Sequence, residues 1–115
     1  MARKKRNPDA IVAAFDTYFG YGTLADWQRL CRDIGLEAEG KNTSSITQCR
    51  KALETVHVNI YDLLHAVRLG TQPQRFGSPK ALSKYCRKTG KIYPKEKAKE
   101  MGPVRVLLRE IFRHR

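Results

Sequence analysis

The chain has 115 residues, of which 41% are hydrophobic and 30% charged. This length suits one compact domain, which can bury enough apolar surface to fold without a metal or disulfide framework. The aromatic and aliphatic content also excludes disorder throughout the chain. Lys and Arg number 23 against 11 Asp and Glu, which gives a formal net charge of +12. This excess favours an acidic partner, such as DNA, RNA or an anionic membrane surface, of which nucleic acid is the preferred choice.

The first part of the chain predicts two helices. Asn7-Pro8 places a capping side chain before a proline, and the apolar residues that follow recur at helical spacing. This pattern predicts a helix over residues 8–19. Thr23 and Asp26 then have the spacing of a capping box, before an apolar stripe that predicts a helix over 24–34. Two glycines lie in the connection, where we expect a tight turn with Tyr21 packed over the core.

The middle of the chain predicts two further helices. Ser45 can cap a helix over 46–56, in which apolar residues stand three and four apart. Asn59 can cap the next helix, over 60–69, which ends before a glycine. The connection between them is short enough for a helix-turn-helix pair or for an ordinary helical hairpin in the core.

The last third of the chain predicts two more helices. Ser78-Pro79 repeats the pattern of a cap before a proline and starts a helix over 79–89. Pro103 starts the last helix, over 103–114, whose apolar residues form one stripe. The predicted fold is all-α, with a single compact domain of five to six helices over 8–115. The residues expected in its core include Phe15, Trp27, Leu30, Leu53, Leu64, Leu107 and Phe112.

A basic arm precedes the first predicted helix. It spans residues 1–7, carries Arg3, Lys4, Lys5 and Arg6, and is predicted to be disordered and flexible. Such an arm can act as a nuclear-import signal, lie along phosphates or a minor groove, or simply improve solubility. The sequence contains neither a secretory signal nor a long apolar run, so we expect a nuclear or cytoplasmic protein that is not secreted and does not enter a membrane.

Basic residues are predicted to share one face on each of the last two main helices. In the helix over 79–89 and just beyond it they are Lys80, Lys84, Arg87, Lys88 and Lys91. In the last helix they are Arg105, Arg109 and Arg113. Like charges at this spacing repel one another, which predicts an anionic ligand; the alternative is a solvated face that maintains solubility. Phe76, Tyr93 and Tyr21 are candidates for base stacking where they are exposed.

The helix over 46–56 offers a second candidate contact with nucleic acid. Opposite its apolar stripe it carries Thr47, Gln48, Arg50 and Lys51. This mixture of side chains can bond to base edges as well as to phosphates, so these are the candidate base-reading residues.

Catalytic chemistry finds little support in the sequence. The serines, histidines and carboxylates lack the spacing of a known catalytic or metal-binding motif. Cys31, Cys49 and Cys86 stand far apart and are expected to act as small buried hydrophobic residues. We therefore expect no catalytic residue, no metal site and no cofactor.

These patterns predict a non-enzymatic nucleic-acid-binding module, with DNA slightly favoured over RNA. The alternative is an adaptor whose basic face docks onto an acidic protein in a nuclear or chromatin complex. Exposed aromatic residues among Tyr18, Tyr21, Tyr61 and Tyr93 would favour the adaptor, because protein interfaces use aromatic anchors. The sequence leaves open a homodimer.

Four stretches carry a resemblance to other proteins. They are FDTYFG (15–20), LADWQRLCRDIG (24–35), SITQCRKAL (45–53) and VNIYDLL (58–64). The chain resembles small uncharacterised fungal proteins over most of its length. The resemblance implies no activity, cofactor or functional site, and a fungal source would suit a nuclear or cytoplasmic setting.

Overall fold

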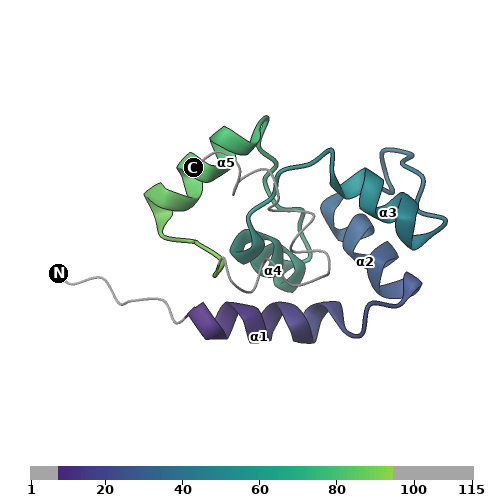
Figure 1. The fold of residues 1–115 in the computed structure, drawn as a ribbon, viewed down its shortest axis with the longest axis horizontal. Helices are drawn as coiled ribbons and strands as arrows, with labels where there is room; N and C mark the ends of the chain where they lie inside the picture. The colour runs from purple at the N-terminus through teal and green to yellow at the C-terminus, as the bar shows by residue number, and fades with distance from the viewer. Residues whose placement is uncertain (1–7, 95–115) are drawn as a thin grey trace.

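Residues 8–94, which the computed structural model describes, form an all-helical fold (Figure 1). In chain order its five helices are α1 (Pro8–Phe19), α2 (Leu24–Ile34), α3 (Ile46–Leu53), α4 (Ile60–Leu69) and α5 (Pro79–Thr89). Figure 1 shows α1 along the bottom, α2 and α3 together at the right, α4 near the centre and α5 at the upper left. The described residues contain no strand, and their β pairing is limited to an isolated antiparallel bridge between Val58 and Arg75.

The third helix is shorter than predicted. It ends at Leu53, whereas the sequence pattern predicted a helix over 46–56. The Thr55 hydroxyl donates to the Ala52 carbonyl at 2.6 Å, and such a local bond competes with a further helical turn. Val56 is buried outside the helix. The other four helices have the predicted bounds.

The predicted basic arm over 1–7 and the predicted helix over 103–114 lie outside the described residues. The same holds for Leu107 and Phe112, which were expected in the core.

Helices α1, α2, α3 and α4 all contribute side chains to the core. Phe15 stacks on Phe19 with ring centroids 5.9 Å apart, and Phe19 meets the edge of Trp27 at 5.3 Å. Leu30 and Leu53 are fully buried, as predicted. Two corrections concern other side chains. Leu64 is only half-buried, and the fully buried residues Leu36 and Val58 were not predicted.

The main contacts of α3 are with α2, and those of α4 are with α1 and α2. The expectation that α3 and α4 pair as a helical hairpin or a helix-turn-helix is therefore wrong. The connection between the two helices, in which Val56, Val58 and Asn59 are buried, explains the difference. It follows an extended path and pairs with the segment before α5 through the backbone N–H of Phe76, which donates to the His57 carbonyl at 2.9 Å.

A carboxylate organises the turn between α1 and α2. Asp26 forms the predicted capping box with Thr23, and one of its oxygens accepts bonds from the backbone N–H groups of Tyr21, Gly22 and Thr23 at 3.0–3.1 Å. These bonds lower the pKa of Asp26, and the bond from the Thr23 backbone has the largest effect. The prediction for Tyr21 is wrong, since its side chain is fully exposed. Polar contacts to Asp26 close this turn, so it does not need aromatic packing.

Arg75 joins the segment before α5 to the end of α2. Its Nη2 donates to the Ile34 carbonyl at 2.9 Å, and its Nη1 forms an ion pair with Glu39 at the same distance. Gly35 makes this approach possible. It has φ +96°, and a Cβ there would lie 3.1 Å from Arg75 Nη2 and 2.8 Å from the Gln72 side chain. The left-handed backbone and the missing side chain are therefore both required at this position.

Two leucine substitutions test the placement of the core. Leu53→Ala removes a side chain that is 0% exposed, whereas the control Leu69→Ala removes one that is 62% exposed. We expect the first to lower the free energy of unfolding by about 2–5 kcal/mol, because it leaves a cavity. The second should change it by less than about 0.5 kcal/mol. Urea unfolding followed by circular dichroism measures both, and equal losses would contradict this core.

Candidate nucleic-acid interface

Helix α5 places its basic residues on the side opposite its buried face. The Ser78 hydroxyl caps its start by accepting from the Ala81 N–H at 3.1 Å, and Gly90 ends it in the left-handed conformation. Leu82 and Ser83 are buried. At about 100° per residue, the four basic residues fall within an arc of about 100° on the far side. They are all exposed, and they are Lys80, Lys84, Arg87 and Lys88. We call these four residues the α5 basic face.

The α5 basic face is not neutralised by other described residues. Helix α5 contains no acidic residue, and the ion pairs found within residues 8–94 involve other cations. From Lys80 to Lys88 the helix rises about 12 Å, which equals the rise of about three to four phosphates along one DNA strand. The face is therefore a concentrated positive surface of a size that suits a phosphate backbone.

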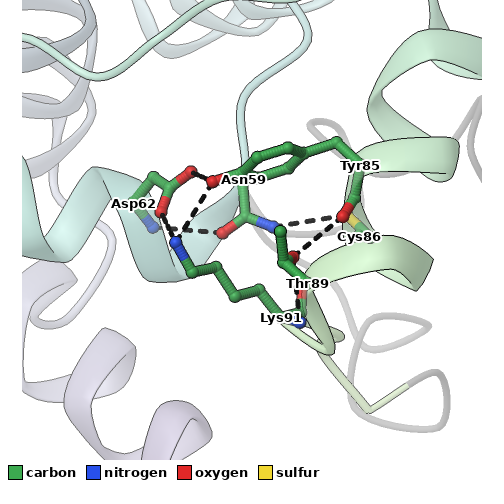
Figure 2. A network of polar contacts seen from close by, with 6 residues as sticks. All are labelled: Asn59, Asp62, Tyr85, Cys86, Thr89 and Lys91. Atoms are coloured by element: carbon green, nitrogen blue, oxygen red, sulfur yellow. Dashed lines mark hydrogen bonds and ion pairs between the residues drawn. The ribbon is translucent and has the colours of Figure 1, made fainter.

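A buried carboxamide attaches the end of α5 to the start of α4 (Figure 2). Asn59 is 2% exposed, and its Oδ1 accepts the Asp62 N–H at 3.1 Å, as the predicted cap requires. Its Nδ2 donates to the Lys91 carbonyl at 2.9 Å and to Cys86 Sγ at 3.3 Å. One side chain thus caps α4 and fixes the chain that leaves α5.

Lys91 does not belong to the α5 basic face, which corrects the sequence prediction. Gly90 ends the helix before it, and its side chain turns to α4. There the ammonium donates to Asp62 at 2.7 Å and to the Tyr85 hydroxyl at 3.1 Å. The hydrogen bond to Asp62 is the main cause that raises the pKa of Lys91. Tyr85 also donates to Asp62 at 2.6 Å, so this carboxylate joins both residues to α4 (Figure 2).

Two of the candidate stacking residues are turned inward. Phe76 is half-buried and lies against Tyr85, with ring centroids 4.8 Å apart. Tyr93 is buried among the core residues. Tyr21 keeps an exposed ring, but it lies on the turn between α1 and α2.

The candidate base-reading residues of α3 do not form one exposed row. The Arg50 guanidinium lies over the Trp27 ring, 5.3 Å from its centroid, and Gln48 is half-buried. Thr47 and Lys51 are exposed. Stacking on the tryptophan was not predicted, because the two residues are distant in sequence and meet only when α3 packs on α2.

Two of the three cysteines are buried as expected, and the third is not. Cys31 and Cys49 are buried and Cys86 is half-buried. Burial raises the pKa of Cys31 to about 12 and also raises the pKa of Cys49 and Cys86. Within residues 8–94, no group of three or more His, Cys, Asp or Glu residues is placed to hold a metal ion.

The remaining predicted site residues lie outside the described part of the chain. They are Arg3, Lys4, Lys5, Arg6, Arg105, Arg109 and Arg113. Among the helices of residues 8–94, none has the length and apolar character needed to span a membrane. The chain matches no protein-family model, no curated protein and no solved structure.

Replacing Asn59 tests the attachment of α5. Asn59→Ala removes the cap of α4 and two buried hydrogen bonds, so we expect the free energy of unfolding to fall by about 2–4 kcal/mol. Asn42→Ala is the control, because Asn42 is exposed and its side chain accepts one bond within its own loop. We expect its loss to stay below about 1 kcal/mol. Similar values for both variants in urea unfolding would show that Asn59 does not join the two helices.

The Lys91 ion pair predicts a dependence of stability on alkaline pH. The folded state raises the pKa of Lys91 above its ordinary value of 10.5. The stabilisation is therefore fully present below that value and is lost as the pH rises through the higher, folded-state pKa.

The measurement compares wild type with Lys91→Met across this pH range. At about pH 7 the variant should be less stable by roughly 1 kcal/mol, and the difference should shrink above about pH 10.5. Lys41→Met, which replaces an exposed lysine, serves as the control. A difference between wild type and Lys91→Met that stays constant with pH would contradict the role of the charge.

Proposed function

We propose that the protein is a non-enzymatic nucleic-acid-binding module that acts in the nucleus, with DNA slightly favoured over RNA. The observation that carries the proposal is the α5 basic face, where four exposed cations lie on one side of one helix. Binding to phosphates releases the counterions around them and offsets the repulsion between cations at helical spacing.

The attachment of α5 supports the same proposal. Contacts at both ends position this helix, through Arg75 before its start and Asn59 after its end. A fixed helix holds the backbone positions of its cations in one array, so binding does not also have to order the helix. The basic residues of 1–7 and 103–114 belong to the proposal as further phosphate contacts.

An adaptor that docks onto an acidic protein is the second candidate, and the exposed Tyr21 is the observation in its favour. The other three tyrosines proposed as interface anchors are engaged within the protein. Tyr18 donates to Asp33 at 2.5 Å, Tyr61 donates to the Ile92 carbonyl at 3.3 Å, and Tyr93 is buried. A single exposed ring far from the α5 basic face supports an interface less well than four clustered cations support phosphate binding.

Removing cations from α5 tests the proposed function. The triple variant Lys84→Ala, Arg87→Ala and Lys88→Ala should bind duplex DNA of any sequence more weakly than wild type. If wild type contacts about four to six phosphates, log affinity should fall with log salt at a slope of roughly −4 to −5. The variant should flatten this slope by up to about 3. Fluorescence anisotropy at several salt concentrations measures both quantities.

The matched control removes the same charge from elsewhere on the surface. Arg32, Lys41 and Arg68 are exposed and lie on or beside other helices, so replacing all three with Ala keeps the net charge equal in the two variants. We expect the control to keep most of the affinity and the slope. Equal losses in both variants would mean that binding follows net charge rather than the α5 basic face. If wild type fails to bind duplex DNA or RNA at low salt, the proposed function is wrong.

A further inference from the structure

We propose that the α5 basic face selects double-stranded over single-stranded nucleic acid. This inference rests on the proposed function and names its ligand class more closely. It follows from two features of the described residues: the fixed cations on α5 and the inward orientation of the aromatic rings beside them.

The cations favour the ligand with the denser charge. A duplex carries one phosphate per about 1.7 Å of its axis, and each of its strands carries one per about 3.4 Å. The α5 basic face rises about 12 Å from Lys80 to Lys88, and a duplex segment of that length carries about twice as many phosphates as a single strand of the same rise, so the face lies in a stronger negative field beside a duplex. Ala81 is exposed beside these residues and has no side-chain polar group to bond with a base.

Single-strand binding proteins compensate for lower charge density by stacking bases on aromatic rings, and each stacked base strengthens binding by about 5- to 150-fold. The rings nearest the α5 basic face are not free to do this. Phe76 packs against Tyr85, and the Tyr85 hydroxyl donates to Asp62 at 2.6 Å. Tyr93 is buried in the core. These rings are therefore engaged within the protein, and Tyr85 attaches α5 to α4.

The exposed ring of Tyr21 is separated from this face by the body of the fold. Tyr21 belongs to the connection between α1 and α2, which Figure 1 shows at the lower right, whereas α5 lies at the upper left. The fully exposed ring and the four cations therefore do not form one platform. Tyr21 gives the experiment a useful control, because single-strand binding by stacking would depend on it.

The experiment measures anisotropy with three labelled probes at one low salt concentration. They are a mixed-sequence DNA duplex, a thymine single strand of the same length, and a longer thymine strand with as many phosphates as the duplex. The proteins are the full chain, the triple variant of Lys84, Arg87 and Lys88, and Tyr21→Ala. Circular dichroism and urea unfolding check that each variant is folded.

We expect the full chain to bind the duplex at least about fivefold more tightly than either single strand. The α5 variant should lose most of this preference, and Tyr21→Ala should retain it. If a single strand binds as tightly as the duplex, or if Tyr21→Ala weakens single-strand binding, the inference of duplex selectivity is wrong while nucleic-acid binding stands. If the full chain binds none of the probes, both this inference and the proposed function are wrong.

Discussion

The carboxamide of Asn59 is the interaction on which the position of the basic helix depends. It is buried, and its oxygen and nitrogen serve two different helices: the oxygen caps α4, and the nitrogen holds the carbonyl of Lys91 after α5. A buried amide that lost either partner would cost stability, so the geometry of both helices is set together. Asp62 reinforces the same joint through Tyr85 and Lys91.

Two kinds of basic residue result from this arrangement. Lys91 and Arg75 are used within the protein, where Asp62 and Glu39 neutralise them. The cations of the α5 basic face extend away from these contacts and remain exposed. Asp62 and Glu39 thus stabilise the fold where its segments meet and do not shield this face. The formal charge of the sequence does not distinguish paired cations from exposed ones, whereas their contacts in the structure do.

The sequence predicted most helix ends and missed most contacts between distant residues. Capping residues and glycines are read within a few positions, so Thr23, Ser78 and Gly90 marked the helix ends that the structure has. The end of α3 was missed because the burial of Val56 depends on packing across the fold. Lys91 continued the helical spacing of α5, and its ion pair with Asp62 depends on a partner 29 residues away. Tyr21 was misplaced because the turn is closed by Asp26 rather than by apolar packing.

The approach of Arg75 to the end of α2 has a mechanical consequence. Arg75 stands three residues before Ser78 and holds the carbonyl of Ile34, while Asn59 holds the chain just after α5. Both ends of α5 are therefore held by hydrogen bonds to other parts of the fold, and we call these two contacts its anchors. A long polyanion that pulled on α5 would load both anchors at once, and the force would pass into α2 at one end and α4 at the other. Peeling the helix away from either end alone would leave the opposite anchor intact.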